Sequence, residues 1–489
     1  MARFALTALA FLLLEVLAVN AGDDNNDNSP YYGGDDNYPV YGGDDGDCDN
    51  NPYNFTFLAD SGVFGPPLEV VHAYFGEWPN GVSVSSTGRI FSNFPAIVLG
   101  NVNNGTPGVF AVAELTSPST EEAYPSEDIN TPPCPGGAVN LTDPENPVGC
   151  GSPDHFISVQ SVQVDTEDRL WILDTGRPIY TLPDGSVILV NSSYGGPKLV
   201  GVDLSTDLVF QTILFPEDVV FPDTSYIDDF RIDLNASLSN TTGEGVAYIT
   251  DTSLWGDNAI IVVDLGTGDS WRRLEGDPSV VAEPNFLPFI WGQPLYFTED
   301  PANPPDGNLT TTTPAYLPAG VNGLTLSADG ETLFYADLAG RDLYSVPTAL
   351  LRERDDAVEA ELAAAVVNYG NTGFSDGMET DPETGFIYKG SIEANAVVAF
   401  DADTGMTQTV VRDPRLGWVD SLSVAELEDE ETGETQSWLY ISSDQFDRSW
   451  WFWAPGAHSG DIQERPFGLF RVPLPLPDPD CEFAGASNY

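Results

Sequence analysis

Basic residues are scarce in this chain. Lys and Arg number 17 among 489 residues, against 76 Asp and Glu, and the formal net charge at pH 7 is −59. The only lysines are Lys198 and Lys389. Such a charge repels phosphate backbones and anionic lipid, which argues against nucleic acid and membrane surfaces as partners. It favours cations, amines and basic proteins.

Histidine and cysteine are also rare. The three histidines lack metal-ligand spacing, and the chain has neither a C-x-x-C pair nor a G-x-S-x-G elbow. Zinc, redox and serine-hydrolase chemistry therefore have little support. Four cysteines in a secreted chain predict two disulfides, for which three pairings are possible. We favour Cys134–Cys150, which closes one Pro/Gly-rich loop, and Cys48–Cys481, which joins the two ends of the chain.

Long apolar runs are missing except at the N-terminus, where Arg3 precedes an apolar stretch that ends near Val19 and small residues precede a cut after Ala21. This pattern predicts a signal peptide over residues 1–21. Residues 22–51 contain nine Asp and no basic residue, which is typical of a disordered acidic tail. No later run approaches the roughly 18 apolar residues of a spanning helix. We therefore expect a secreted, extracellular protein without membrane insertion, in which residues 52–489 form the folded domain.

Seven N-x-S/T sequons agree with passage through a secretory pathway. The predicted glycosylation sites are Asn54, Asn104, Asn140, Asn191, Asn235, Asn240 and Asn308.

A pattern of short strands repeats six times along the chain. Each copy has a polar residue, usually a small residue, an alternating strand, a turn and a second strand rich in aromatic residues. The copies span 80–93, 160–174, 228–251, 322–337, 376–390 and 420–442. Repeated four-stranded units predict an all-β fold, a six-bladed β-propeller, with Leu68–Tyr74 as the strand that closes the last blade. The helical pattern over Leu350–Val367 predicts one helix outside the ring.

The polar residue that opens each copy belongs to the innermost strand, so the six residues should form a ring around one channel mouth. The predicted ring consists of Asn80, Gln160, Asp228, Asn322, Asp376 and Asp420. Three carboxylates that close together require a bound cation or protonation of some of them. Because the ring offers oxygen without His or Cys, the ion it predicts is calcium, and Asp228, Asn322 and Asp376 are its candidate ligands. The alternative is that these residues cap strand starts.

Aromatic residues and further acids follow the second strands, which end near the same mouth. Asp174 and Asp251 are therefore candidate ligand-binding residues, together with Trp255 and Trp450. An aromatic wall above carboxylates suits an aromatic or cationic small molecule. The alternative is that these aromatic side chains cover blade edges.

Several segments resemble the yellow / major royal jelly protein family, namely residues 81–91, 168–176, 197–204, 248–251, 270–273 and 321–327. The resemblance runs from about Leu68 to Pro473 and implies a secreted six-bladed propeller. Family members have varied roles, so the resemblance predicts the fold more closely than the function.

Two segments also resemble the senescence-marker-protein/gluconolactonase propellers, which are metal-dependent lactone hydrolases. Residues 322–337 look like the segment that bears a metal-ligand Asn, here Asn322, and residues 375–378 look like the segment whose Asp, here Asp376, is both a metal ligand and the general base. Asp228 stands where that family has an Asn-type residue, and Asn80 stands where a Glu is expected. The resemblance therefore implies a hydrolase with two departures from the family pattern.

Three functions remain open from the sequence. The first is a secreted propeller that binds, or rearranges, a small aromatic or cationic molecule such as an amine or a phenol. The second is a calcium-dependent lactonase-type hydrolase with Asp376 as the catalytic base. The third is an extracellular storage or structural protein.

Overall fold

The computed structural model describes residues 62–474, apart from residues 107, 184, 186, 298–314, 429–432, 450 and 454–462. Several sequence predictions lie outside these residues: the signal peptide, the acidic tail, Cys48–Cys481, the sequons at Asn54 and Asn308, and Trp450. No helix in the described part of the chain is long and apolar enough to cross a membrane.

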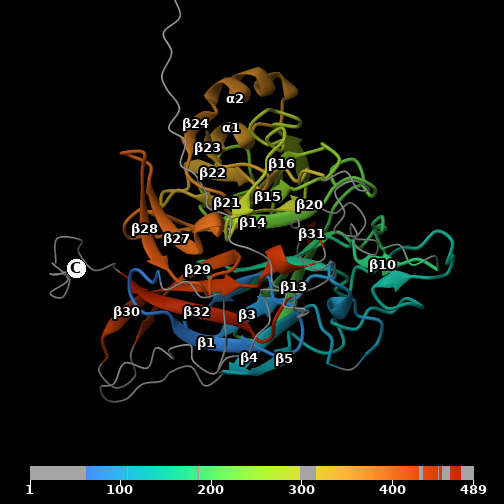
Figure 1. Ribbon diagram of the computed structural model, residues 1–489. Coiled ribbons are helices and arrows are strands. Elements are labelled where there is room, and N and C mark those ends of the chain that lie inside the picture. Colours follow the sequence, from blue (N-terminus) through green and yellow to red (C-terminus); the bar gives the residue numbers. More distant parts are fainter. Residues whose placement is uncertain are drawn as a thin grey trace, which may run out of the picture. The chain divides into compact units, whose positions relative to one another are not determined.

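Six four-stranded antiparallel sheets form the blades of a β-propeller (Figure 1). Blade 1 consists of β2 (Val82–Val84), β3 (Ile90–Asn93), β4 (Val112–Ser117) and β5 (Thr120–Ala123). Blade 2 consists of β8 (Val159–Val164), β9 (Arg169–Asp174), β12 (Lys198–Asp203) and β13 (Leu208–Leu214). Blade 3 consists of β14 (Ile227–Asp233), β15 (Val246–Asp251), β16 (Ala259–Asp264) and β17 (Ser270–Arg273).

The remaining blades follow the same plan. Blade 4 consists of β21 (Val321–Leu326), β22 (Thr332–Asp337), β23 (Asp342–Pro347) and β24 (Val367–Asn371). Blade 5 consists of β25 (Met378–Thr380), β26 (Ile387–Ser391), β27 (Ala396–Asp401) and β28 (Met406–Arg412). Blade 6 consists of β29 (Val419–Glu428), β30 (Thr435–Ser443), β32 (Phe467–Leu474) and β1 (Glu69–Tyr74). The predicted propeller, and the closure of its last blade by an N-terminal strand, are confirmed.

Shorter elements decorate the loops between the strands. Four two-stranded pairs join β6 (Val139–Asn140) to β7 (Val148–Gly149), β10 (Ile179–Thr181) to β11 (Val187–Leu189), β18 (Phe289–Ile290) to β19 (Gln293–Pro294), and β20 (Tyr296–Phe297) to β31 (Phe452–Trp453). The 3-10 turns are η1 (Leu99–Asn101), η2 (Asp356–Val358), η3 (Ile392–Ala394) and η4 (Phe446–Arg448).

The single helix predicted over Leu350–Val367 is wrong in its extent. The segment contains α1 (Thr348–Leu351) and α2 (Glu359–Ala365), and Val367 begins the edge strand β24. Tertiary contacts interrupt the helix, because the Arg352 guanidinium donates to the Tyr248 hydroxyl at 2.7 Å and Arg273 Nε donates to the Glu353 carbonyl at 3.0 Å. Tertiary bonds of this kind override helix propensity.

The hydrophobic core lies between neighbouring blades, because each sheet has alternating apolar residues that must be covered on both faces. One cluster of buried side chains fills each of the six junctions, for example Phe334, Leu343, Met378 and Ile387 between blades 4 and 5. The other five clusters fill the junctions between blades 1 and 2, 2 and 3, 3 and 4, 5 and 6, and 6 and 1.

Both lysines of the chain are buried in this core. Lys198 and Lys389 are each 0% exposed. Lys198 Nζ lies 2.8 Å from Asp174 Oδ2, whereas Lys389 Nζ donates to Thr372 Oγ1 at 2.6 Å and has no ion pair with a described residue. Burial therefore lowers the pKa of Lys389 to about 7.

The disulfide prediction for Cys134–Cys150 is confirmed, and the bond spans 16 residues. It lies in the loop region that follows blade 1, and the two cysteines pack against Ala138 and Ile157.

Candidate functional site

One cavity of about 100 Å³ lies at one end of the central channel. All six residues of the predicted ring line it: Asn80, Gln160, Asp228, Asn322, Asp376 and Asp420. Each is at least nine-tenths buried. The repeat therefore brings one polar side chain per blade to one place, as the sequence predicts, while the ligand-binding role of these residues stays a prediction.

Four of the six ring residues lie at register shifts between the first and second strands of their blades. The register between the first and second strands shifts at Val159/Ser161, Ile227/Phe230, Val321/Leu324 and Val419/Leu422, so each shift encloses a ring position. A bulge leaves its extra residue unpaired and aims the side chain away from the regular pleat. Gln160, Asp228, Asn322 and Asp420 thereby reach the cavity.

Glycine follows the ring residue where neighbouring inner strands come closest. A Cβ on Gly323 would lie 2.0 Å from the carbonyl oxygen of Asp376, and a Cβ on Gly377 would lie 2.2 Å from that of Asp420. Only glycine allows these contacts. The Asn-Gly and Asp-Gly pairs of the repeat thus set how tightly the ring closes.

Neutral donors satisfy the three ring carboxylates. Asn322 Nδ2 donates to Asp228 Oδ2 at 2.8 Å, and Asn80 Nδ2 donates to Asp420 Oδ2 at 2.7 Å. Trp418 Nε1 donates to Asp376 Oδ2 at 2.7 Å. No ring carboxyl group forms an ion pair with a described basic residue, so no ion pair offsets the cost of ionising these groups.

Burial and mutual repulsion keep these carboxyl groups difficult to ionise. Desolvation, followed by the charge of Asp229, raises the pKa of Asp228 to about 7. Desolvation also raises the pKa values of Asp376 and Asp420 well above the usual range, with further repulsion from Asp420 on Asp376 and from Asp444 on Asp420. A cation in the cavity would reverse this effect and favour the ionised forms.

An apolar and aromatic wall completes the cavity. Its aromatic members are Trp78, Tyr226, Phe297, Phe446, Trp451 and Phe452. Phe297 stacks on Trp451 with ring centroids 5.9 Å apart, and Phe452 packs 5.5 Å from Trp418. The short pair β20–β31 carries Phe297 and Phe452, and so brings together loops from two distant parts of the chain.

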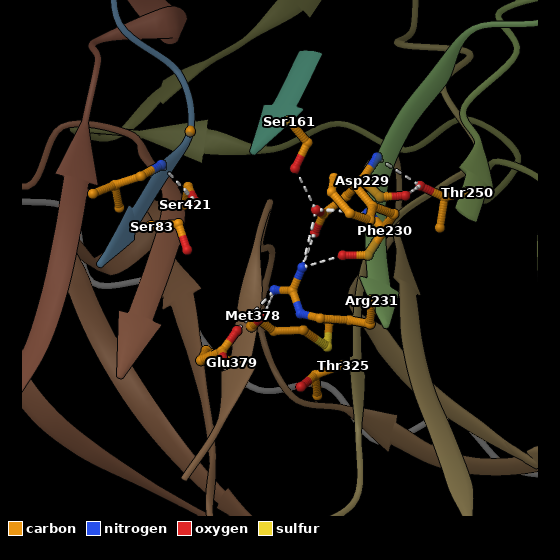
Figure 2. A network of polar contacts seen from close by, with 12 residues as sticks. Ser83, Ser161, Asp229, Phe230, Arg231, Thr250, Thr325, Met378, Glu379 and Ser421 are labelled. Atoms are coloured by element: carbon orange, nitrogen blue, oxygen red, sulfur yellow. Dashed lines mark hydrogen bonds and ion pairs between the residues drawn. The ribbon is translucent and has the colours of Figure 1, made fainter. Parts of the chain in front are cut away.

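A charged cluster centred on Arg231 joins blades 3 and 5 (Figure 2). Arg231 of β14 contacts Asp229 Oδ1 at 3.0 Å in its own blade and Glu379 Oε2 at 3.1 Å in blade 5. It also donates to the carbonyl oxygen of Met378. Ser161 Oγ donates to Asp229 Oδ1 at 2.9 Å. Asp229, Ser161 and Ser421 line both the main cavity and a second, polar cavity of about 50 Å³ that Arg231 also lines.

The site therefore combines three carboxyl groups that have no described ionic partner with an aromatic wall. In the charged cluster beside them, the one described cation, Arg231, is already paired. Such a site can hold a positive charge by ionic contact with the acids and by cation–π contact with the rings. Its protonated carboxyl groups can also donate and accept protons at a bound molecule.

A family model described as "Major royal jelly protein" matches residues 157–450. This chain belongs to the major royal jelly protein family.

Two curated relatives in this family come from Apis mellifera. Major royal jelly protein 1 is 26% identical over 201 residues, which is 41% of this chain and 39% of that protein. Major royal jelly protein 7 is 26% identical over 195 residues, which is 40% of this chain and 35% of that protein. The aligned regions thus span well under half the length of either relative.

Solved structures with similarity to this royal jelly family member include three named enzymes or binding proteins. A gluconolactonase from Xanthomonas campestris has a TM-score of 0.38 and 12% identity, and the match covers 85% of this chain and 97% of that one. A calcium-binding regucalcin from Agrobacterium tumefaciens has a TM-score of 0.38, 13% identity and coverage of 81% and 90%. A luciferin-regenerating enzyme has a TM-score of 0.41, 10% identity and coverage of 84% and 97%. At these values the similarity implies nothing about the chemistry of the cavity.

Three residues that the sequence places at the mouth lie elsewhere. Asp174 is 0% exposed and accepts from the backbone N–H groups of Ile157 and Ser158, at 2.7 and 2.9 Å. Asp251 is also 0% exposed and accepts from the Tyr226 N–H at 2.8 Å. The second strands end in buried acids that hold the segments leading into the inner strands, and these acids do not line the cavity.

Trp255 also lies outside the cavity. Its side chain is 52% exposed and its ring lies 4.9 Å from the guanidinium of Arg177. The neighbouring Leu254 lines the cavity instead. Similarly, Trp451 and Phe452 supply the aromatic wall from the Trp450–Trp453 run, while Trp450 itself is not described.

The donor set fits a metal ion poorly. The described residues contain no group of three His, Cys, Asp or Glu side chains that could hold one. Of the candidate ligands, Asp228 and Asn322 hydrogen-bond to each other, and Asp376 accepts from an indole N–H. N–H donors thus occupy oxygens that a calcium ion requires as ligands.

The residues two positions before each ring residue in the chain were not predicted as part of the site. This position is aromatic in four blades, as Trp78, Tyr226, Phe374 and Trp418. The Tyr226 hydroxyl donates to Gln160 Oε1 at 2.7 Å, and Trp418 binds Asp376. The repeated aromatic-x-polar spacing was the available signal.

Proposed function

We propose that this protein binds a small molecule with an aromatic or apolar body and a cationic group, such as an arylalkyl amine, in the cavity at the channel mouth. One observation carries the proposal: three carboxyl groups without a described ionic partner share a single cavity with five Trp and Phe side chains. A phenol or a lactone could use the same aromatic wall but would leave the carboxyl groups uncompensated.

The raised pKa values of the three ring acids support a positively charged ligand. Asp228, Asp376 and Asp420 all have raised pKa values because burial and neighbouring acids disfavour ionisation. A positive charge nearby stabilises the ionised forms. An anionic ligand would instead add to the repulsion, and a neutral one would leave it unchanged.

Tryptophan fluorescence can test the proposal with matched probes. We expect 2-phenylethylamine to change the emission saturably at neutral pH, because Trp78 and Trp451 line the cavity. The neutral isostere 2-phenylethanol should bind at least about tenfold more weakly, a difference of about 1.4 kcal/mol. If neither probe, nor phenol, nor a simple lactone changes the emission, the binding proposal is wrong and a storage or structural role gains support.

A matched pair of variants localises the site. Asp376→Asn should weaken binding of the amine but leave binding of the alcohol nearly unchanged. Asp337→Asn is the control, because Asp337 is also a buried acid with a raised pKa but does not line the cavity in the described structure. Equal effects of the two substitutions on amine binding would point away from this cavity.

The hydrolase alternative requires a bound metal, with Asp376 as base. Asp376 accepts a hydrogen bond from an indole N–H and Asp228 accepts one from a side-chain amide, which reduces the oxygens available to a metal. The hydrolase therefore has less support than the binding function. It predicts a stoichiometric divalent ion, of which calcium is the first choice, in purified protein, and lactone hydrolysis that both a chelator and Asp376→Ala abolish. Absence of the ion together with unchanged activity of the variant would remove this alternative.

We also propose secretion, from the signal-peptide pattern over residues 1–21 and the sequons. When the protein is expressed with its native leader, we expect it in the culture medium, beginning at Gly22. Its mass should fall when N-glycans are removed. Retention in the cell with Met1 intact would contradict it.

A further inference from the structure

Arg177 is buried beside the wall of the cavity, in the loop that follows β9. Its side chain is 1% exposed. Arg177 Nε donates to the Val190 carbonyl at 3.0 Å, and Arg177 Nη1 donates to the Ser225 carbonyl at 2.8 Å. The same guanidinium lies 4.9 Å from the centre of the Trp255 ring. One side chain therefore contacts three separate loops.

These three contacts lie next to the cavity in the chain. Each contacted residue has a chain neighbour that lines the cavity, and these neighbours are Leu189, Tyr226 and Leu254. They belong to the β10–β11 hairpin, the segment before β14 and the β15–β16 loop. Because Arg177 holds the adjacent backbone or ring, these side chains cannot move outward without breaking its contacts. The Tyr226 hydroxyl in turn donates to Gln160 Oε1 at 2.7 Å, which joins this part of the wall to the ring.

The backbone on both sides of Arg177 is fixed. Gly176 has a φ of 66°, and a Cβ there would lie 2.7 Å from the backbone nitrogen of Pro197. Only glycine allows this turn at such close approach. On the other side, the Pro178 carbonyl accepts from the Val190 N–H at 3.0 Å. The turn after β9 therefore directs Arg177 toward the loops and keeps it there.

The contacts of Arg177 use the shape of the guanidinium. Desolvation lowers the pKa of Arg177 to about 10, so the group stays charged at neutral pH at a cost in stability. Its planar fork presents N–H groups in fixed directions, whereas a lysine ammonium is a point charge. An apolar side chain would avoid the desolvation but leave two carbonyl oxygens without this donor. The arrangement thus requires arginine for geometry, not for charge alone.

We propose that Arg177 is a positioning residue that sets the width of the cavity and thereby limits the size of the amine that binds. The inference rests on the function proposed above. Arg177 itself does not line the cavity, so it acts through Leu189, Tyr226 and Leu254. While these three side chains are held, the cavity keeps its volume of about 100 Å³. Without Arg177 they can move outward, and a bulkier ligand can enter.

Titration calorimetry with two primary amines of different size measures this role. The probes are 2-phenylethylamine and 2,2-diphenylethylamine, which share the ammonium group and the two-carbon chain but differ by one phenyl ring. The native protein should bind the larger amine at least about tenfold more weakly, and Arg177→Met should reduce this ratio to below about threefold. The preference for 2-phenylethylamine over 2-phenylethanol should stay at the native value, because the ring acids are unchanged.

Two further variants distinguish positioning from a general loss of stability. Arg273→Met removes another buried arginine, whose Nε donates to the Glu353 carbonyl at 3.0 Å and which does not line the cavity. It should keep the native size ratio. Arg177→Lys keeps the charge without the fork and should lower the ratio as Arg177→Met does. An unchanged ratio in Arg177→Met, a lowered ratio in Arg273→Met, or a native ratio in Arg177→Lys would overturn the inference.

Hydrogen exchange separates this inference from the proposed function, because it needs no ligand. In Arg177→Met the backbone amides of Val190 and Tyr226 should exchange at least about tenfold faster, while those of β27 in blade 5 keep the native rate. If 2-phenylethylamine does not bind the native protein, the proposed function and the size limit are both wrong, and faster exchange at these amides would still support the positioning role. Unchanged exchange at both amides would overturn that role even if the amine binds.

A different substitution serves if Arg177→Met does not fold. Trp255 is 52% exposed and contacts the guanidinium without lining the cavity. Trp255→Ala therefore removes one of the three contacts at a tolerant position. We expect the size ratio to fall at least about threefold. An unchanged ratio in this variant would overturn the inference.

Discussion

The indole nitrogen of Trp418 donates to Asp376 Oδ2 at 2.7 Å, and both residues are buried at the start of neighbouring blades. Desolvation and the neighbouring acids raise the pKa of Asp376 well above its usual range, and this hydrogen bond acts in the opposite direction. The same indole ring packs 5.3 Å from Phe374 and 5.5 Å from Phe452. Trp418 therefore connects a cavity carboxyl group to the aromatic wall.

Trp418→Phe keeps the ring but removes its N–H. We expect the free energy of unfolding to fall by about 1–3 kcal/mol, since a hydrogen bond to a buried carboxyl group is lost. The pKa of Asp376 should rise further, so the amine probe should bind about tenfold more weakly at neutral pH. Trp171→Phe is the control, because Trp171 Nε1 donates to Asp165 Oδ2 over the same 2.7 Å in blade 2, away from the cavity. Stability should fall in both variants and affinity only in Trp418→Phe; a loss of affinity in both would contradict the local role.

Lys389→Met should stabilise the protein at neutral pH. The folded-state pKa of Lys389 is about 7, against 10.5 for an ordinary lysine. Between these values the unfolded chain binds a proton that the folded chain does not, so native stability rises with pH in that window. The variant should flatten this rise and gain roughly 1–3 kcal/mol near pH 7.

The control for this experiment is Lys198→Met, which should have the opposite sign. It leaves the buried carboxylate of Asp174 without its ion pair and should cost about 3–5 kcal/mol. Denaturant unfolding across the pH range measures both variants. A destabilised Lys389→Met would show that Thr372 gains more from the ammonium than burial costs.

His72 joins the closing strand β1 to blade 1. Its Nδ1 donates to the Ser117 carbonyl at 2.7 Å, and its Nε2 lies 3.0 Å from Glu121 Oε1, while the side chain is 1% exposed. His72→Leu should lower the free energy of unfolding by about 1–3 kcal/mol, because two acceptors lose their partner. His155→Leu, at a partly exposed histidine bonded to Ser152, should change it by less than about 0.5 kcal/mol. Equal effects of the two substitutions on thermal unfolding would contradict a role of His72 in closing the propeller.

Loss of the Cys134–Cys150 bond should affect stability but not binding. The bond closes a loop of 16 residues, for which chain entropy predicts a cost of about 3 kcal/mol. Neither cysteine lines the cavity. The double Ser variant should therefore unfold at a lower temperature and bind the amine probe as the native protein does, and a tenfold weaker affinity would indicate that this loop shapes the mouth.

The inner ring could be predicted from the sequence because its position is tied to a repeat. Asn322 and Asp376 open strands whose offsets recur in every blade, and the propeller geometry then brings equivalent positions together. Asp251 and Trp255 could not be placed in this way, because the directions of their side chains depend on loop contacts with Tyr226 and Arg177. The break in the helix after Leu351 likewise depends on bonds to residues about 80 to 100 positions away in the chain.

Asp444 shows a different kind of limit. In the sequence it follows a strand like the acids that end the second strands of other blades, and nothing local distinguishes it from Asp251, which pairs with Arg272 at 2.8 Å. Asp444 forms no ion pair with a described residue, and burial together with the charges of Asp376 and Asp447 raises its pKa well above the usual range. The partner of a buried acid is a property of the tertiary structure.

The burial of both lysines also determines how the chain meets reactive molecules. With Lys198 and Lys389 each 0% exposed, the native fold presents no side-chain amine to acylating reagents, aldehydes or quinones, and no lysine to a lysine-specific protease. Labelling of these two amines requires the blades to open. Their rate of modification therefore reports unfolding of the propeller, and the measurement needs no added probe.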